Sequence, residues 1–179
     1  MTNPSYHLSK LAPGKYDLGA FDCGEQTYND WLKKSALGAV SAGTCAVYVL
    51  VRDDGTSAVM GYFSIGPTQV VRDDLPTKMG RGAPQAVPGW LLGKLALHVD
   101  LQGNAEESWG SRLLIAALEK IVAVADDGGG KVIVVDADNE GLLGFYLRHD
   151  FQSVSAELSV EGSLRLFMKV STARKAIGR

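Results

Sequence analysis

The sequence WLLGKLALHV, residues 90–99, is nearly all apolar. A run of this kind is typical of a strand that is buried on both faces of a sheet. Residues 110–125 follow, with apolar side chains at helical spacing, and then a second apolar run, KVIVVD, occupies residues 131–136. The order of strand, helix and strand predicts a βαβ unit with a right-handed crossover.

Further strands and helices are predicted on both sides of this unit. Asp22 and Glu25 have the spacing of a capping box, which predicts the start of an amphipathic helix over residues 24–37. Residues 72–89 contain three prolines and three glycines, which predicts a long loop. The other predicted elements are a strand at 5–11, a hairpin of strands at 44–52 and 58–71, a short helix at 139–148, closing strands at 151–154 and 164–170, and a basic tail at 171–179.

The composition is that of an ordinary globular domain of 179 residues, with 46% hydrophobic and 21% charged residues. The net charge of -2 gives no overall basic surface for nucleic acid, although local basic clusters remain. With 2 cysteines, the chain has neither a disulfide framework nor a four-cysteine zinc site, and no metal is predicted. The sequence has no signal peptide and no run apolar enough to span a bilayer, so the expected location is the cytoplasm.

Two segments carry residue types that suit chemistry. In the first, the buried strand leads through a polar loop to a helix that begins near Gly110 and Ser111. Unpaired backbone N–H groups at such a helix start favour an anion, although an ordinary strand–loop–helix connection has the same pattern. In the second, Asn139 opens a short helix that ends in Phe145 and Tyr146. A tyrosine in this position is either a core residue with one hydrogen bond or part of a site.

Together the two segments resemble the pyrophosphate-binding loop and the closing motif of the GCN5-related N-acetyltransferases, the GNAT superfamily. The N-terminal sequence is similar to a subgroup of that superfamily, the GNAT-type toxins of bacterial type II toxin–antitoxin systems. The residues that resemble the opening of these toxins are Phe21-Asp22-Cys23-Gly24, Asn29, Trp31-Leu32 and Ala36. Residues 61–64 and 87–97 resemble further blocks of the group, and the resemblance covers roughly residues 5–170.

The resemblance implies the GNAT fold, an α/β (α+β) architecture. A central mixed, twisted sheet of about six to seven strands would be splayed in its middle and flanked by about three to four helices. Residues 1–179 would form a single acetyltransferase domain, with 171–179 as its basic tail. The strand at 95–99 would diverge from the strand at 131–136, and the pantetheine arm of acetyl-CoA would lie in the gap.

The resemblance also implies an activity, that of an acetyl-CoA-dependent N-acetyltransferase of the toxin type. Such an enzyme acetylates the α-amino group of aminoacyl-tRNA and thereby blocks translation. The implied partner is a ribbon–helix–helix antitoxin, and a homodimer is left open. Two alternatives also stay open: a GNAT that acetylates a small amine or a protein amine, and a binding module that kept the fold but lost the cofactor.

Particular residues take implied roles in this activity. Tyr146 would donate a proton to the leaving thiolate, a backbone N–H near Leu97 would polarise the thioester carbonyl, and His98 would either assist through a water or only follow the strand. The implied cofactor-binding residues are Leu95, Leu97, Val99, Gln102, Gly103, Gly110, Ser111, Arg112 and Asn139. Basic side chains that suit tRNA, or else an ordinary solvated surface, are Lys33, Lys34, Arg72, Lys78 and Arg81.

The loop at residues 102–110 departs from the family pattern. It is about three residues longer than usual, and it places Glu106 and Glu107 where the pyrophosphate is expected. Like charges at such short distances disfavour binding unless the carboxylates point to solvent. The loop therefore either bulges outward and leaves its Gly110 end intact, or it weakens or abolishes cofactor binding.

Overall fold

The computed structural model describes residues 4–155 and 158–178. The chain divides into two compact units, of which unit 1 comprises Met1–Gly66 with Lys94–Ala117, and unit 2 comprises Pro67–Gly93 with Leu118–Arg179. The expectation of a single domain over residues 1–179 stays a prediction.

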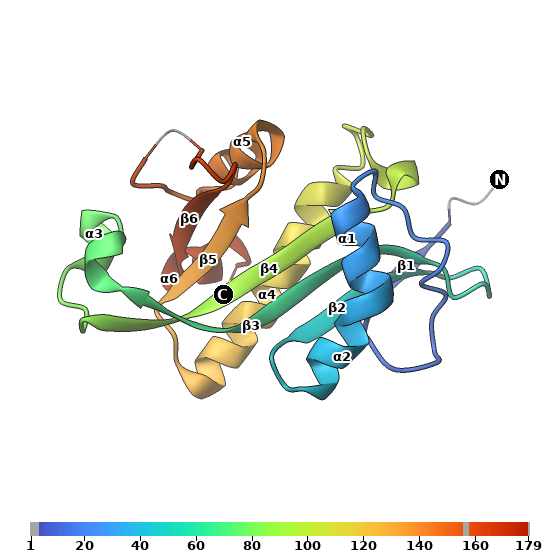
Figure 1. The fold of residues 1–179 in the computed structure, drawn as a ribbon, viewed down its shortest axis with the longest axis horizontal. Coiled ribbons are helices and arrows are strands. Elements are labelled where there is room, and N and C mark those ends of the chain that lie inside the picture. Colours follow the sequence, from blue (N-terminus) through green and yellow to red (C-terminus); the bar gives the residue numbers. More distant parts are fainter. Residues whose placement is uncertain (1–3, 156–157, 179) are drawn as a thin grey trace. The chain divides into compact units, whose positions relative to one another are not determined.

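Six strands form one sheet in the order β1-β2-β3-β4-β5-β6 (Figure 1). Neighbours pair antiparallel between β1 and β2, between β2 and β3, and between β5 and β6, whereas β4 and β5 pair in parallel. The sheet is therefore mixed, as the sequence predicts. The strands span Tyr6–Lys10 (β1), Ala46–Arg52 (β2), Val59–Val71 (β3), Ala86–Leu97 (β4), Val132–Ala137 (β5) and Leu164–Lys169 (β6).

The helices connect these strands. The first three follow one another without a break: α1 (Gln26–Asp30), the π-helix η1 (Trp31–Ser35) and α2 (Ala36–Ser41). The others are the 3-10 helix η2 (Arg72–Asp74), α3 (Thr77–Gly80), the 3-10 helix η3 (Val99–Leu101), α4 (Trp109–Gly128), α5 (Glu140–Arg148) and α6 (Val170–Ala176).

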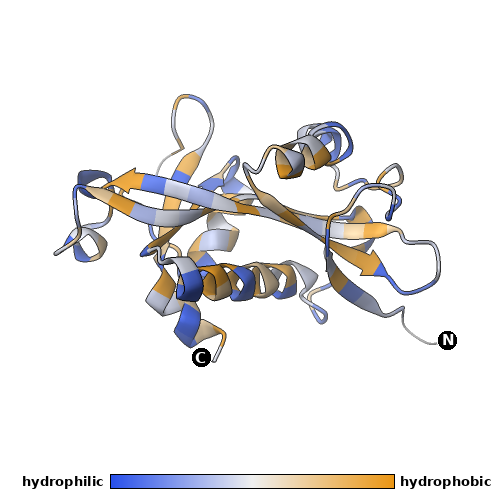
Figure 2. Cartoon of the chain, turned by 90° about the horizontal axis from the view of Figure 1, so that it is seen from below, coloured by the Kyte–Doolittle hydropathy of each residue, from blue (hydrophilic) through white to orange (hydrophobic). Residues whose placement is uncertain are grey.

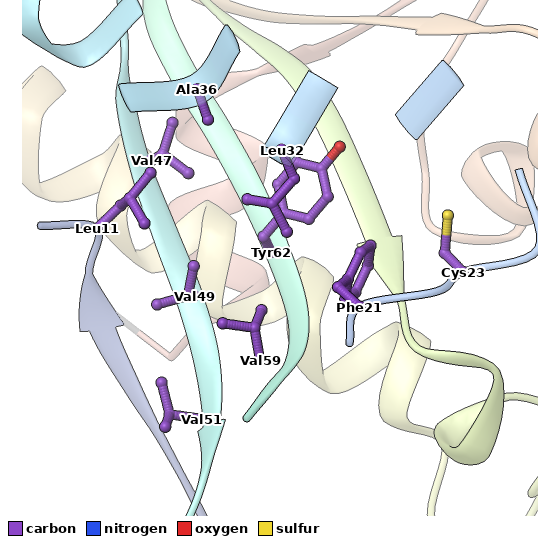
Figure 3. Packing of buried hydrophobic residues seen from close by; sticks show 10 residues of the cluster. All are labelled: Leu11, Phe21, Cys23, Leu32, Ala36, Val47, Val49, Val51, Val59 and Tyr62. Atoms are coloured by element: carbon purple, nitrogen blue, oxygen red, sulfur yellow. The ribbon is translucent and has the colours of Figure 1, made fainter. Parts of the chain in front are cut away.

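The core of unit 1 lies between strands β1 to β3 and the segment from α1 to α2. Alternate residues of β2 lie on the same face of the sheet, as the two-residue period of a strand requires. Val47, Val49 and Val51 share one face, and all three are buried. Figure 3 shows them in one apolar cluster with Leu32 and Tyr62. Because burial of an aliphatic or aromatic side chain stabilises by about 1.5–3 kcal/mol, this cluster holds the helical segment on the sheet.

The helical segment differs from the predicted helix at 24–37. The capping-box prediction is wrong: Glu25 is the N-cap residue, but its side chain makes no capping hydrogen bond. The Asp22 carboxylate instead accepts from the backbone N–H of Gly24 and from the side-chain amide of Asn29. The buried side chain of Asn29 hydrogen-bonds to Asp22, and the spacing of Asp22 and Glu25 in the sequence does not reveal this contact. The helix also contains the π-turn η1 and continues to the end of α2.

The core of unit 2 forms on β4, β5 and β6, where Val87, Val134 and Phe167 are buried together. Met79 of the short helix α3 packs into the same cluster. The prediction of a loop over 72–89 is therefore wrong in part, because the segment contains η2 and α3 and β4 begins at Ala86. A helix of four residues is too short to show a periodic pattern in the sequence.

Near the C-terminus, one predicted strand is absent from the described residues and one helix was not predicted. The expected strand at 151–154 is reduced to a single bridge between Gln152 and Phe167. The expected tail at 171–179 contains α6, whose residues Val170 and Ala173 are buried. Only two buried positions mark this helix, and the apolar pattern in its sequence is correspondingly weak.

The helix α4 carries the predicted apolar stripe and begins and ends close to the predicted bounds of 110–125. Figure 2 shows apolar and polar residues alternating around it. Its buried residues are Leu113, Leu114, Ala117, Leu118, Ile121, Val122 and Ala125. Among the described residues, no helix has both the length and the apolar character needed to cross a membrane.

The parallel ladder between β4 and β5 is short. It joins Gly89–Leu92 with Val132–Val135, all in unit 2, and among the described residues no β4–β5 pair is recorded beyond Leu92 and Val135. At its start a Cβ atom on Gly89 would lie 2.5 Å from the Val132 carbonyl oxygen. The close approach of the two backbones at this point therefore requires glycine.

We predict that Gly89→Ala destabilises the protein by about 1–3 kcal/mol, because the added methyl group forces the backbones of β4 and β5 apart. Urea unfolding followed by circular dichroism measures the change. The control is Gly38→Ala in α2, where a Cβ would meet nothing within 4 Å. This control should stabilise by about 0.5–1 kcal/mol, since alanine favours helix. Equal stabilities of the Gly89 variant and the wild type would contradict the role of this contact.

Candidate functional site

The extended loop before α4 is folded into a local turn. The side-chain oxygen of Asn104 accepts from the backbone N–H groups of Glu106 and Glu107, at 3.1 and 3.2 Å. The backbone N–H of Ser108 donates to the Asn104 carbonyl at 3.0 Å, and Ser108 has a φ of 48°. The backbone N–H groups of Glu106, Glu107 and Ser108 thus find their hydrogen-bond acceptors within the loop itself.

The carboxylate of Glu107 has a partner in this turn. It accepts a hydrogen bond of 2.8 Å from the indole N–H of Trp109. The guanidinium carbon of Arg112 lies 5.0 Å from the centre of the Trp109 ring, and Tyr6 packs edge-on against the same ring. A cation over an indole face is attracted to it, so Arg112 is held at the start of α4. Glu106 is exposed.

The start of α4 has the geometry expected of an anion site. Its first helical hydrogen bond runs from the N–H of Arg112 to the carbonyl of Ser108, at 3.0 Å. The amides of Trp109 and Gly110 precede this bond and lie at the positive end of the helix dipole. Gly110 and Ser111 are half-buried, whereas Arg112 is exposed.

The end of β4 is tied to the loop that carries Phe21 and Cys23 (Figure 3). The N–H of Val99 donates to the carbonyl of Asp22 at 2.9 Å, and the N–H of His98 donates to the carbonyl of Met60 in β3 at 2.9 Å. The Val99 side chain is 42% exposed. Leu95 and Leu97 are half-buried.

Gln102 and Gly103 follow this turn. The side-chain nitrogen of Gln102 donates to the carbonyl oxygens of Leu97 and Cys23, at 2.7 and 2.8 Å. Gly103 has a φ of 74°, a conformation that favours glycine. The sequence predicts that Gln102 and Gly103 bind the cofactor, and this stays a prediction, but it does not predict the two contacts of Gln102.

Asn29 anchors the same loop from the helix side, and sequence reasoning missed this role. It is only 5% exposed. Its side-chain oxygen accepts from the N–H of Cys23 at 2.9 Å, and its side-chain nitrogen donates to the Asp22 carboxylate at 2.9 Å. The spacing of the motif FDCG and Asn29 was visible in the sequence, and it reflects this network.

His98 has a structural contact that bears on its expected role. Its Nδ1 atom accepts from the backbone N–H of Asp100 at 3.1 Å, which makes His98 the N-cap of η3. A neutral ring with an occupied Nδ1 acceptor carries its proton on Nε2. The observed contact fits the positional alternative for His98.

In unit 2, the closing motif places Asn139 and Tyr146 on α5. Asn139 is the N-cap, and its side-chain oxygen accepts from the N–H of Leu142 at 2.9 Å. Tyr146 is 4% exposed and packs edge-on against Phe145 and Phe151. Burial, and then the charges of Asp138 and Asp136, raise the pKa of its hydroxyl above the ordinary value.

The predicted basic residues are divided between the two units. Lys33 and Lys34 lie on η1 and are exposed, and Lys34 forms an ion pair with Asp30 at 3.2 Å. In unit 2, Arg72 and Arg81 line a cavity of about 360 Å³. Arg72 also donates to the Ala83 carbonyl and to the Gln85 side chain, so it holds its own loop together. Lys78 is exposed on α3.

Lys94 of β4 belongs to a cluster that the sequence did not predict. Its ammonium group lies 5.3 Å from the ring centre of Tyr28 and 5.8 Å from that of Trp31. Trp31 in turn stacks on Tyr62, with ring centres 5.8 Å apart. This cluster fastens the strand that carries Leu95 and Leu97 to the helical segment of unit 1.

Comparisons with known proteins place this arrangement among bacterial toxins. No protein-family model matches the chain. The chain is 32% identical over 162 residues to a tRNA-acetylating toxin of Mycobacterium tuberculosis, and the match covers 90% of this chain and 91% of that protein. It is 27% identical to a probable toxin TacT of Sinorhizobium fredii, over 96% of this chain and 94% of that one.

Solved structures agree with these relatives. The crystal structure of a tyrosine-to-phenylalanine mutant of KacT superposes with a TM-score of 0.85 and 26% identity, covering 96% of this chain and 98% of that one. AtaT complexed with acetyl-methionyl-tRNAfMet gives a TM-score of 0.83 and 25% identity, covering 96% and 99%. Both likenesses extend over nearly the whole chain.

The hydrogen bonds of Asp22 predict a pH dependence of stability. The N–H of Gly24, and then the amide of Asn29, lower the pKa of the Asp22 carboxyl in the folded protein. A lowered pKa contributes stability that is present above the unfolded value of about 3.9 and is lost as the pH falls through the folded value. We expect Asp22→Asn to weaken this acid-induced loss, measured by urea unfolding between about pH 3 and pH 7.

The control for this measurement is Asp127→Asn, which changes an exposed carboxylate near the end of α4. The control should keep the acid-induced loss of the wild type. An identical pH dependence of the wild type and the Asp22 variant would contradict the proposed network.

Proposed function

This chain belongs to the family of the tRNA-acetylating toxins, which are of GNAT type, and on that premise we propose that it transfers the acetyl group of acetyl-CoA to the α-amino group of an aminoacyl-tRNA. The observation that carries the proposal is the 32% identity to such a toxin over 90% of the chain. The neighbour AtaT, complexed with acetyl-methionyl-tRNAfMet, supports an aminoacyl-tRNA as the acceptor class. Acetylation of the α-amino group blocks use of that tRNA in translation.

The start of α4 suits the pyrophosphate of acetyl-CoA. The amides of Trp109 and Gly110 lie at a helix N-terminus, where N–H groups and the helix dipole favour an anion. The carboxylate of Glu107, which the sequence places at this point, accepts from the Trp109 indole instead of remaining unpartnered. These observations favour the alternative in which the longer loop leaves the Gly110 end intact. Ser111, Arg112 and Gly103 stay proposed contacts at this end.

We assign the pantetheine arm to the backbone groups of Leu95 and Leu97 in β4 and to the carbonyl of Val99, whose N–H already donates to Asp22. The N–H of Leu97 would donate to the thioester carbonyl oxygen, where negative charge develops during attack. Asn139 would contribute its side-chain N–H₂, since its oxygen already accepts from Leu142.

Tyr146 is the proposed proton donor. The amine nitrogen attacks the thioester carbon, the C–N bond forms and the C–S bond breaks, and the thiolate takes the proton of the Tyr146 hydroxyl. The proton lost from the amine goes to solvent, from which Tyr146 recovers its own. The raised pKa of Tyr146 keeps the hydroxyl protonated throughout the neutral range. An α-amino group has a pKa of about 8, so a useful fraction is neutral at pH 7 without a strong base.

Partners and location follow from the same premise. One relative is named a tRNA-acetylating toxin and another a probable toxin, and the solved neighbours include a KacTA–DNA complex. We propose a ribbon–helix–helix antitoxin as the partner of this chain. We also propose a cytoplasmic location, because charged tRNA and acetyl-CoA meet there.

The test is acetyl transfer from labelled acetyl-CoA to charged tRNA, with free polyamines and peptides as competing acceptors. We expect charged tRNA to be acetylated and Tyr146→Phe to lower turnover at least about tenfold, because general acid catalysis typically contributes that much or more. Acetyl-CoA affinity, measured by calorimetry, should change little, since only the hydroxyl is removed. The control Tyr48→Phe changes a tyrosine of β2 that stacks on Phe63.

The results of this assay distinguish the proposed function from its two alternatives. Preferred acetylation of polyamines or peptides would favour a GNAT for small or protein amines. An absence of acetyl-CoA binding at millimolar concentration would favour a binding module without the cofactor. Unaltered turnover of the Tyr146 variant would remove this residue from the mechanism.

We propose that Lys33 and Lys34 contact the tRNA backbone, because both are exposed on the same turn. Reversal of both charges to glutamate should weaken tRNA acetylation by about tenfold or more at low salt and less at high salt. The matched control is Lys10→Glu with Lys15→Glu, which changes the net charge equally at other exposed positions of unit 1. Equal effects of the two double variants would show that only the total charge matters.

A further inference from the structure

The side-chain amide of Gln102 has both of its hydrogens committed within the protein. The nitrogen lies 2.7 Å from the carbonyl oxygen of Leu97 and 2.8 Å from that of Cys23. Both partners are acceptors, so the amide must present its nitrogen to them, because the opposite orientation would set three oxygens against one another. We call these two hydrogen bonds the β4 clasp.

The β4 clasp leaves Gln102 poorly suited to bind pyrophosphate, the role that its position in the sequence suggests. A primary amide has two N–H donors and one oxygen acceptor. With both donors used, only the side-chain oxygen remains, and an anion that offers acceptors alone gains nothing from it. The role of Gln102 is therefore to be found in the carbonyl groups that it contacts.

One of these carbonyls belongs to the part of β4 that the proposed reaction uses. In a strand, the N–H and C=O of one residue point to the same edge, and the next residue points to the opposite edge. The N–H of His98 points toward β3, because it donates to Met60. The N–H and C=O of Leu97 therefore point to the edge of β4 opposite β3, and the side-chain nitrogen of Gln102 holds that edge by donating to the Leu97 carbonyl oxygen.

The other carbonyl connects this edge to a rigid support. Cys23 is buried, and its N–H is bound by the side chain of Asn29, which is itself 5% exposed. The N–H of Val99 donates to the neighbouring carbonyl of Asp22. The end of β4 is thus held at Leu97 through Gln102 and at Val99 directly, by one loop of unit 1.

We propose that Gln102 is a positioning residue, which holds the carbonyl of Leu97 and thereby orients the backbone of this residue, so that the Leu97 N–H meets the thioester carbonyl oxygen of the acetyl donor. This inference rests on the proposed acetyl transfer. A positioning role differs from a cofactor contact in a measurable way. Displacement of the oxyanion donor affects transfer from every acetyl thioester, whereas loss of a pyrophosphate contact affects only donors that contain pyrophosphate.

The experiment compares two acetyl donors, acetyl-CoA and acetyl-pantetheine, which lacks the pyrophosphate and the nucleotide. We expect Gln102→Ala to lower kcat/KM by about tenfold or more with both donors and by the same factor, as loss of transition-state positioning does. Gln102→Glu keeps the size of the side chain but puts oxygens in place of donors, so it should be at least as impaired. The matched control, Gln26→Ala, removes another glutamine hydrogen bond, to Asp30 on the exposed face of α1, and should leave both rates unchanged.

A second readout does not depend on activity. Amide hydrogen exchange at His98 and Val99 should accelerate at least about fivefold in Gln102→Ala, because the clasp no longer restrains the strand end, while the midpoint of global unfolding changes little for an exposed side chain. A decrease in kcat/KM confined to acetyl-CoA, or unchanged exchange at both amides, would overturn the proposal. An inactive wild-type protein would instead overturn the acetyl transfer on which it rests.

Discussion

Backbone carbonyl and amide groups that lose their strand partner must find another, and this constraint governs the part of the structure that matters for function. The recorded β4–β5 pairing stops at Leu92, but β4 continues to Leu97. A peptide group without a partner costs about as much as a lost hydrogen bond. At Leu97 the cost is avoided for the carbonyl, which accepts from Gln102, and the N–H on the same edge is the group that we propose to bind the acetyl donor.

The same reasoning explains how the chain tolerates carboxylates beside a proposed anion site. Glu107 is tied to the indole of Trp109, and the ring of Trp109 also carries the guanidinium of Arg112 on its face. The carboxylate and the guanidinium thus contact the same indole, and the positive charge of Arg112 stays at the start of α4 beside the proposed anion site. Asn104 closes the turn through two backbone amides, so the longer loop is ordered by its own hydrogen bonds. Length alone, which is all that the sequence offers here, does not reveal this arrangement.

Much of the fold could be predicted because burial imposes a period on the sequence. The apolar stripe of α4 and the apolar runs of β4 and β5 satisfy that rule, and their elements occur within a few residues of the predicted bounds. The predictions fail where one hydrogen bond between side chains, or a few buried residues, determines the local structure. Asn29 takes Asp22 away from the predicted capping box, and α6 is held by only two buried residues. The roles of Gln102 and Lys94 depend on partners distant in the chain, such as Cys23 and Tyr28, which no local pattern encodes.

The environment of Tyr146 limits the chemistry that its hydroxyl can perform. Removal from water and the negative charges of Asp138 and Asp136 both disfavour a tyrosinate. Arg165 forms a two-point hydrogen bond with Asp136, at 2.8 and 2.9 Å, and so weakens but does not remove that influence. A hydroxyl held in its neutral form cannot act as a base or a nucleophile at neutral pH, but it can give a proton to an anion that forms beside it. The raised pKa thus keeps the donor form of Tyr146 filled at neutral pH, but it also makes the hydroxyl a weaker acid than an ordinary phenol. The proton donation that we propose for Tyr146 therefore requires that the tyrosinate is short-lived and regains a proton from solvent.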